Sequence, residues 1–142
     1  MTYIDTLFGL KGKTAAVIGG GGVLAGAMSE GLAKAGADVA VLDLNPENAE
    51  KQCERIMKLG VRSLAIQMDV SQKSEIQAAC DRIIDNWGHV DILINAPGIN
   101  SGTPFLEITE EEWERLIRVN LKGVFLSCQV FGKYFIDNNI AA

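Results

Sequence analysis

The chain has 142 residues, of which 48% are hydrophobic and 22% are charged, and its formal net charge is −5. This acidic balance leaves no basic surplus to displace counterions from phosphates, which excludes nucleic acid as an expected partner. No apolar run reaches the roughly 18 residues of a membrane span, and the start lacks the basic region of a signal peptide, so we expect a cytoplasmic protein with no membrane partner.

Four short apolar segments have the length of β-strands. They comprise residues 14–18, 38–43, 63–68 and 90–94. The segments around residues 16 and 93 are almost continuously apolar, as strands buried on both faces of a parallel sheet are.

Longer segments with helical periodicity separate these strands. Glycines end the first three, and polar caps begin the second and the third. We place these helices from Leu24 to Gly36, from the Asn45 cap to Gly60 and from the Ser71 cap to Gly88. The first of these helices is predicted to repeat Leu24, Met28, Leu32 and Ala35 along one apolar face. Cys53, Cys80 and Cys128 occupy apolar helix positions, and we expect them to be buried reduced thiols.

A capping box predicts the start of a fourth helix. Thr109 would be its N-cap and Glu112 its third residue, with Trp113, Leu116 and Ile117 facing inward. The apolar pattern continues to Phe135, which predicts one long helix that is bent or broken near Lys122-Gly123. Phe125, Phe131 and Phe135 would have little within the chain to cover them.

The alternation of strands and helices defines the fold class. Segments of these lengths favour right-handed crossovers and a parallel, doubly wound α/β sheet of the Rossmann type. With no linker or repeat to divide the chain, residues 1–142 form one predicted domain.

The run Gly19–Gly22 lies between the first strand and the first helix. Within it, Gly20-x-Gly22-x-x-Ala25 fits the pattern G-x-G-x-x-[GA]. Glycines allow a dinucleotide pyrophosphate to approach the backbone, and the helix N-terminus offers free N–H groups to its charge. The alternative is a flexible turn between a strand and a helix, with a purely structural role.

Asp43 ends the second predicted strand, 21 residues after Gly22. A carboxylate at this place accepts hydrogen bonds from an adenosine ribose and repels a 2′-phosphate. Leu44 and Asn45 follow it, and neither could hold that phosphate as an arginine would. Together the turn and the carboxylate favour a nucleotide site with NAD preferred to NADP, over a solvated aspartate at a strand end.

These features and three further segments resemble the short-chain dehydrogenase/reductase family. Asp69-Val70 is similar to the family's adenine-contacting pair, and Asn95-Ala-Pro-Gly98 is similar to its Asn-Asn-Ala-Gly motif. Val119-Asn120 resembles the stretch with the family's helix asparagine, which holds a proton-relay water.

The resemblance implies a strand order of 3-2-1-4 in a sheet that stops before its fifth strand. It assigns the pyrophosphate to Gly19–Leu24 (Gly19, Gly22, Val23 and Leu24 in particular), the ribose to Asp43, the adenine to Asp69 and Val70, and the nicotinamide side to Asn95, Ala96 and Gly98. Asn120 would be the only residue of catalytic type. The resemblance also implies a small-molecule substrate, with a faint indication of sugar acids or polyols from the glycine run, and a homo-oligomer formed through the C-terminal helix.

The chain departs from the family's T-G-x-x-x-G-x-G turn at three positions. Ile18 replaces the threonine, Val23 the second glycine and Ala25 the third. Val23 is expected to crowd a close backbone approach. In the second motif, Pro97 removes one N–H group.

The family's catalytic Ser and Tyr-x-x-x-Lys have no counterpart in these 142 residues. Tyr134 is followed four positions later by Asn138, not lysine. We therefore expect an NAD-dependent oxidoreductase whose 142 residues alone do not catalyse turnover. Two alternatives stay open: a non-catalytic dinucleotide-binding module, and a degenerate relative that only dimerises. No cluster of ligand-type residues predicts a metal site.

Overall fold

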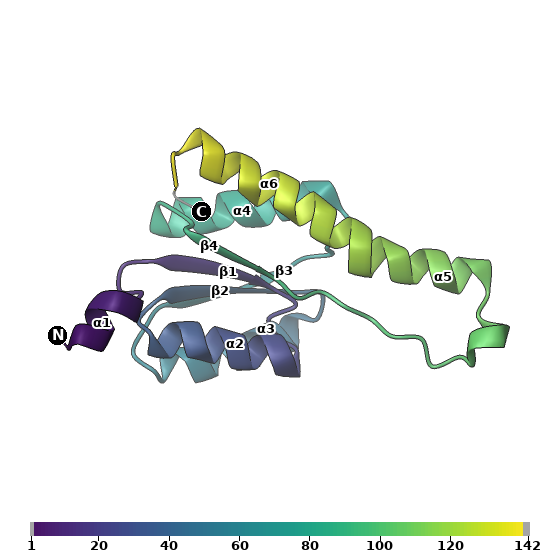
Figure 1. Cartoon of the computed structure of the whole chain (residues 1–142), viewed down its shortest axis with the longest axis horizontal. Helices are drawn as coiled ribbons and strands as arrows, with labels where there is room; N and C mark the ends of the chain where they lie inside the picture. Colours follow the sequence, from purple (N-terminus) through teal and green to yellow (C-terminus); the bar gives the residue numbers. More distant parts are fainter. Residues whose placement is uncertain (1, 141–142) are drawn as a thin grey trace.

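Four parallel strands lie at the centre of the structure, a computed structural model that describes residues 2–140 (Figure 1). The strands are β1 (Thr14–Ile18), β2 (Asp38–Asp43), β3 (Ser63–Gln67) and β4 (Ile92–Asn95). Their order in the sheet is β3-β2-β1-β4, which confirms the expected order. All three pairings are parallel, so the carboxyl ends of the strands meet at one edge of the sheet.

Helices follow the strands in alternation. They are α1 (Tyr3–Phe8), α2 (Val23–Lys34), α3 (Pro46–Met57), α4 (Lys73–Trp87), α5 (Glu110–Ile117) and α6 (Gly123–Asp137), with a 3₁₀ turn η1 (Phe105–Glu107) and a π-helical turn η2 (Arg118–Lys122). None of the helices in residues 2–140 is both long and apolar enough to cross a membrane.

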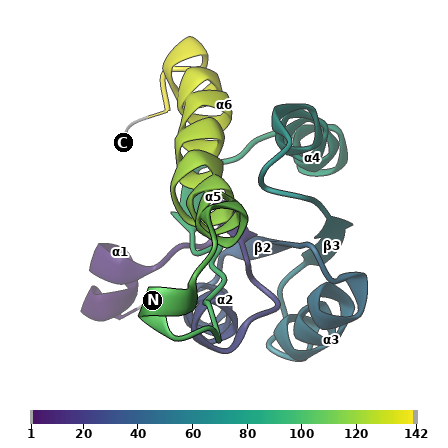
Figure 2. The ribbon, with the colours of Figure 1, turned by 90° about the vertical axis from the view of Figure 1, so that its right-hand side faces the viewer.

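The helices cover both faces of the sheet, as the doubly wound prediction requires. Figure 2 shows α2 and α3 on one face and α4 and α6 on the other. One apolar core joins the sheet to α4 and α6, and a second joins it to α2 and α3. Ala16 and Ile18 face the first core while Val17 faces the second, so β1 is buried on both sides.

Helix α2 packs through a different face from the one expected. Leu24 and Met28 are exposed, and the helix instead buries its small residues Ala25, Gly26, Ser29 and Ala33. Small side chains let the helix axis approach its neighbours, and Gly26 lies so close to α3 that an added Cβ would be 3.0 Å from Oε1 of Gln52. The prediction failed because it took the largest apolar residues to be the buried ones.

The helix ends were predicted with mixed success. Asn45 caps α3 through the backbone N–H groups of Glu47 and Asn48, and Gly88 ends α4 in the left-handed conformation, both as expected. Ser71 is not the cap of α4, which begins after Gln72 without a side-chain cap. The Ser71 N–H is instead held by Oδ1 of Asp69.

Helices α5 and α6 form one long rod, in which η2 is the predicted interruption (Figure 1). Helix α5 extends beyond the sheet and buries no residue, so the inward placement of Trp113, Leu116 and Ile117 was wrong. Phe131 was also misjudged, because it is completely buried against the sheet, whereas Phe125 is 57% exposed.

Two of the three cysteines are buried and one is exposed. Cys53 and Cys80 are buried as expected, and burial raises the pKa of the Cys80 thiol to about 11. Cys128 lies on the exposed side of α6, contrary to the prediction.

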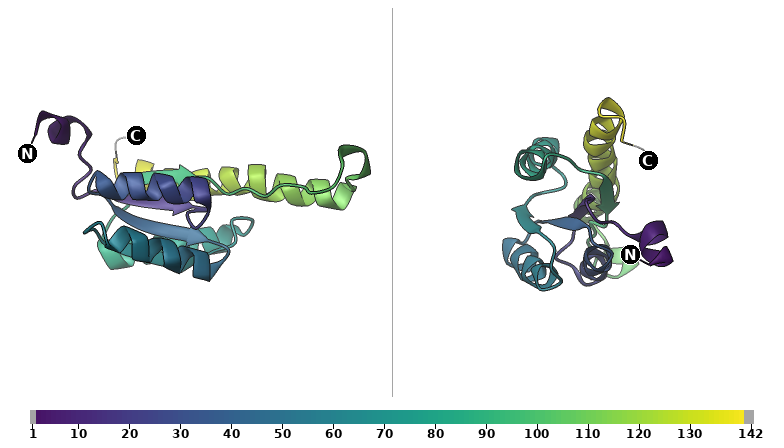
Figure 3. Two further views of the ribbon diagram at one scale, coloured as in Figure 1. Left: turned by 90° about the horizontal axis from the view of Figure 1, so that it is seen from below. Right: turned by 90° about the vertical axis from the view of Figure 1, so that its left-hand side faces the viewer.

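Helix α1 was not predicted. The sequence contains a helix-start pattern, a threonine followed three residues later by an acidic residue. In the structure, Thr2 and Asp5 form this capping box through reciprocal hydrogen bonds of 3.2 and 2.7 Å. The helix stands apart from the sheet layers near the amino-terminal ends of the strands (Figure 3).

The two phenylalanines of α6 provide a matched test of the fold. We expect Phe131→Ala to lower the free energy of unfolding by about 3–5 kcal/mol, because it leaves a cavity in the core. The exposed Phe125→Ala should cost less than about 1 kcal/mol. Denaturant unfolding of both variants measures the difference, and equal losses would contradict the assignment of Phe131 to the core.

Candidate functional site

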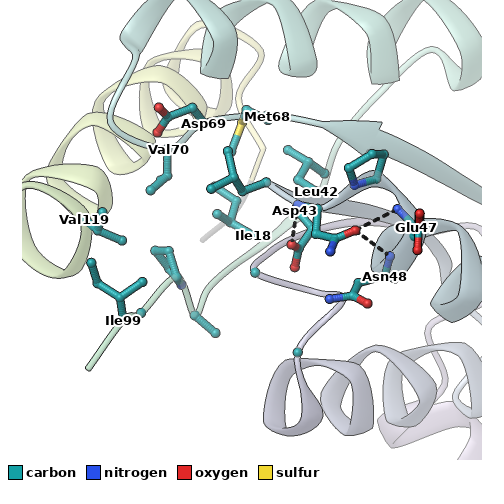
Figure 4. Close-up of a pocket in the computed structure, with 18 residues that line it drawn as sticks. Ile18, Leu42, Asp43, Glu47, Asn48, Met68, Asp69, Val70, Ile99 and Val119 are labelled. Atoms are coloured by element: carbon teal, nitrogen blue, oxygen red, sulfur yellow. Dashed lines mark hydrogen bonds between the residues drawn. The ribbon is translucent and has the colours of Figure 1, made fainter. Parts of the chain in front are cut away.

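A cavity of about 730 Å³ opens at the carboxyl ends of the four strands. Figure 4 shows Asp43 and the start of α3 at one end and Ile99 and Val119 at the other. The wall comprises Ile18, Gly19, Gly22, Leu42, Asp43, Leu44, Asn45, Pro46, Glu47, Asn48, Met68, Asp69, Val70, Ala96, Pro97, Gly98, Ile99 and Val119. Such a position, outside the strand ends of an open α/β sheet, is where these folds bind ligands.

The glycine turn passes through a space too narrow for side chains. Gly19 has φ +74°, and a Cβ there would lie 2.5 Å from the carbonyl oxygen of Ala96. At Gly20 a Cβ would lie 2.9 Å from the carbonyl oxygen of Val17. These two glycines are therefore required by the approach of the turn to β1 and β4, whatever binds beside them.

Asp43 connects the turn to the second strand and the third helix. Its Oδ2 accepts a hydrogen bond of 3.0 Å from the backbone N–H of Gly21, and its Oδ1 accepts one of 2.9 Å from that of Asn45. A Cβ at Gly21 would lie 2.9 Å from the same Oδ2 and 2.8 Å from Cβ of Asn48. The carboxylate is thus fixed by two backbone donors, and its oxygens retain further acceptor capacity toward the cavity.

The N-terminus of α2 offers backbone donors beside this cavity. Gly22 is the N-cap and supplies no side-chain bond, and the first turn contains no acidic residue. The side chain of Val23 is 97% exposed and is not part of the cavity wall, nor is that of Leu24. The expectation that Val23 crowds a ligand at this backbone stays a prediction. The free N–H groups in the first turn of the helix favour an anion there.

Asp69 and Val70 form the cavity wall after β3, next to the apolar side chain of Met68 (Figure 4). Oδ1 of Asp69 accepts from the N–H of Ser71 at 2.8 Å, which holds the start of the loop. Val70 packs against Gly123 so closely that a Cβ there would be 2.8 Å from Cγ1 of the valine. This contact sets the wall against the beginning of α6.

The segment after β4 contributes Ala96 and Gly98 to the wall, but not Asn95. Nδ2 of Asn95 points to Sγ of Cys128 at 3.4 Å, and its Oδ1 is buried without a partner among the described residues. The N–H of Ala96 continues the sheet by donating to the carbonyl of Ile18 at 3.1 Å.

Asn120 lies in the π-helical turn and contacts the site through Ile99. Its Oδ1 accepts from the backbone N–H of Ile99, and its Nδ2 donates to the carbonyl of the same residue, both at 2.9 Å. Asn120 itself is not in the cavity wall, whereas Ile99 and its neighbour Val119 are. Single π-helical turns inside α-helices occur frequently at functional sites.

Sequence reasoning overlooked the apolar part of the wall and the start of α3. Leu42, Met68, Ile99 and Val119 belong to it, as do residues 45–48. The positions of the four apolar residues carried a signal, since each is adjacent in the sequence to Asp43, Asp69, Gly98 or Asn120. Among residues 2–140 there is no group of three or more His, Cys, Asp or Glu side chains placed to hold a metal ion.

Comparisons with known proteins agree with this geometry. The family described as short chain dehydrogenase matches residues 13–141. The 5-keto-D-gluconate 5-reductase of Escherichia coli strain K12 is 33% identical over 134 residues, which are 94% of this chain and 53% of that protein. The chain spans about half the length of the curated relatives it matches.

Solved structures give the same result. A short-chain type dehydrogenase/reductase from Mycobacterium marinum has a TM-score of 0.93 and 29% identity, and the match covers all of this chain and 57% of that one. An NAD⁺-bound xylitol dehydrogenase has a TM-score of 0.89 and 26% identity, with 93% of this chain and 51% of that one covered.

The geometry of the turn predicts the effect of a single methyl group. Gly21→Ala places a Cβ against Asp43 and Asn48, and we expect it to lower the free energy of unfolding by about 1–3 kcal/mol. Gly31→Ala is the matched control, because nothing lies within 4 Å of that Cβ and alanine favours a helix by about 1 kcal/mol. If chemical denaturation shows Gly21→Ala to be as stable as Gly31→Ala, the close contact is not as described.

Proposed function

The chain belongs to the short-chain dehydrogenase family, and from this premise we propose that it binds NAD for hydride transfer between the nicotinamide and an alcohol or carbonyl group of a small-molecule substrate. The observation that carries the proposal is the placement of the glycine turn, the uncapped start of α2 and the Asp43 carboxylate around one cavity. The nicotinamide supplies or accepts the hydride, and the residues of this chain bind and orient the dinucleotide.

The residues present fit a dinucleotide. The cavity lies within the roughly 300–1,000 Å³ of small-molecule sites, and its apolar residues Leu42, Met68 and Val70 suit a flat heterocyclic base. Gly22 and the first turn of α2 would receive the pyrophosphate, where a partial positive charge and free N–H groups stabilise it. Asp69 and Val70 would contact the adenine, and Ala96 and Gly98 would continue the wall toward the nicotinamide.

Asp43 supports the choice of NAD over NADP. Its carboxylate is already aligned by Gly21 and Asn45, so its remaining lone pairs can accept from the ribose hydroxyls without reorganisation. Glu47 and Asp69 add two further acidic side chains to the same wall, and the wall contains no arginine or lysine that could hold a 2′-phosphate.

Asn120 enters the proposal as a positioning residue. Both polar atoms of its side chain are engaged by the backbone of Ile99. In this arrangement Asn120 fixes the wall at Ile99 from within the π-helical turn.

The substrate class is proposed from the relatives together with the glycine run. A 5-keto-gluconate reductase and a xylitol dehydrogenase are among them, which favours a sugar acid or polyol. We propose further that copies associate through the α5–α6 rod, because Leu121, Phe125 and Ile136 expose apolar surface there.

A non-catalytic dinucleotide-binding module is the second candidate. It is favoured by one observation: neither Tyr3 nor Tyr134 is followed four residues later by lysine, so the 142 residues hold no Tyr-x-x-x-Lys.

Replacing Asp43 tests the cofactor proposal. We expect Asp43→Ala to weaken NAD binding about tenfold or more, since hydrogen bonds to a charged group are lost, and to reduce the preference over NADP. Calorimetric titration with both dinucleotides measures the two effects. Glu50→Ala is the control for charge, because it removes an exposed carboxylate of α3 that is not in the wall. Unchanged affinities for both dinucleotides would remove Asp43 from the site.

Turnover distinguishes the two candidates for these 142 residues. We expect the chain to bind NAD but to form no NADH with sugar acids or polyols, because a general acid/base and its supporting groups are missing. Absorbance at the NADH band follows the reaction. Formation of NADH above the background would show that other side chains of this chain supply the proton transfer.

A further inference from the structure

The loop after β4 lacks the backbone bonds that hold the rest of the cavity wall. In the described chain, residues 97–103 make no backbone–backbone hydrogen bond. Gly98 and Gly102 lie within this loop, and a Cβ at Gly102 would meet nothing within 4 Å. Glycines without packing partners leave a backbone free to move, so side chains must fix the loop.

Two side chains from the α5–α6 rod do so. Asn120 holds Ile99, as described above, and Glu112 holds the part of the loop farther from the sheet. Oε1 of Glu112 accepts from Oγ of Ser101 at 2.6 Å, and its Oε2 accepts from Oγ1 of Thr103 at 2.9 Å. The N–H of Thr103 in turn donates to Oγ of Ser101 at 3.0 Å, which closes the group. We name Glu112, Ser101 and Thr103 the hydroxyl latch.

The latch uses Glu112 in a way that the capping box did not predict. Thr109 caps the N–H of Glu112 as expected, at 3.2 Å, but the Glu112 carboxylate does not return to the N-cap. It turns instead toward two hydroxyl donors, which both need an acceptor. Hydrogen bonds from Ser101 and then Thr103 hold the pKa of Glu112 below its usual range, so the carboxylate stays ionised to a lower pH than an ordinary glutamate does.

We propose that Glu112 is a positioning residue, which holds Gly98 and Ile99 in the wall of the nucleotide cavity by fixing Ser101 and Thr103. This inference rests on the proposed function for its ligand. The physical link is short, because Ile99 is in the wall and only Asn100 separates it from the latch. With the latch open, the loop is anchored by Asn120 alone. Dinucleotide binding must then order the freed loop residues, and the entropy lost in doing so lowers the affinity.

Hydrogen exchange tests the latch directly. Glu112→Gln replaces the two charged acceptor oxygens by one neutral oxygen, so the hydrogen bonds from the Ser101 and Thr103 hydroxyls are weakened or lost. We therefore expect the backbone amides of Ile99 and Thr103 to exchange about tenfold faster. Glu111→Gln is the matched control: it removes the same charge from the same helical turn, and the exposed side chain of Glu111 makes no hydrogen bond to the described residues. Equal protection of the loop in the two variants overturns the latch.

A second pair of variants separates the hydroxyl from the shape of residue 103. Thr103→Val removes the hydroxyl and should accelerate exchange of the loop amides, as Glu112→Gln does. Thr103→Ser retains a hydroxyl and should leave the protection of these amides unchanged. The combination of Thr103→Val with Glu112→Gln should be no worse than Glu112→Gln alone, because Glu112→Gln already changes the acceptor of the Thr103 hydroxyl. Additive effects contradict a shared latch.

NADH affinity links the latch to the cavity. We expect Glu112→Gln to weaken NADH binding about threefold to tenfold by raising the cost of ordering the loop, with a thermal midpoint equal to that of Glu111→Gln. An affinity equal to that of Glu111→Gln overturns the positioning role. If the unmodified chain does not bind NADH, the proposed function fails and the positioning role with it, while the exchange experiment still decides whether the three residues form a latch.

Discussion

The passage of the backbone from β1 into α2 is the constraint on which the site depends. The turn must fit between the ends of β2 and β4, and at Gly19, Gly20 and Gly21 any Cβ would meet another atom at less than 3.0 Å. This close fit holds the start of α2 at the strand ends, where its N-cap Gly22 is part of the cavity wall. The same contact places Gly21 within reach of Asp43, so the carboxylate serves both as a brace of the turn and as a wall of the cavity.

The two apolar layers hold this arrangement from both faces. Alternate residues of β1 enter different cores, and Phe131 closes the layer formed by α4 and α6. Because α6 is fixed there, the π-helical turn at its start and the α5 helix before it have defined positions. Asn120 and Glu112 can then reach back to the loop after β4 from a rigid rod, although α5 itself buries nothing.

Periodicity and turn chemistry were sufficient to predict the four parallel strands to within two residues of their ends, because buried strands and glycine stops depend on local sequence. The order of the strands was predicted from the resemblance to the family. The predicted glycine turn, Asp43 and the residues after β3 and β4 surround the cavity for the same reason: parallel strands bring their carboxyl ends together. The burial of individual side chains and their hydrogen-bond partners could not be predicted, because they depend on contacts with residues distant in the sequence. Phe125 and Phe131 look alike in sequence, and only the packing of α6 separates them. Glu112 likewise matches a capping box, but two hydroxyls eleven and nine residues earlier compete successfully for its carboxylate.

Backbone hydrogen bonds explain how the structure accommodates two departures from the family pattern, Ile18 and Pro97. Ile18 cannot brace the turn with a hydroxyl, but the N–H groups of Gly19 and Gly20 both donate to the carbonyl of Leu42, at 2.7 and 3.2 Å. The turn is thus held by main-chain bonds to β2 in addition to the Asp43 carboxylate. Pro97 removes an N–H group from a stretch that makes no backbone–backbone bond, so no pairing in the sheet is lost. Main-chain bonds therefore hold the glycine turn without the threonine hydroxyl, whereas the loop after β4 depends on the side chains of Asn120 and Glu112.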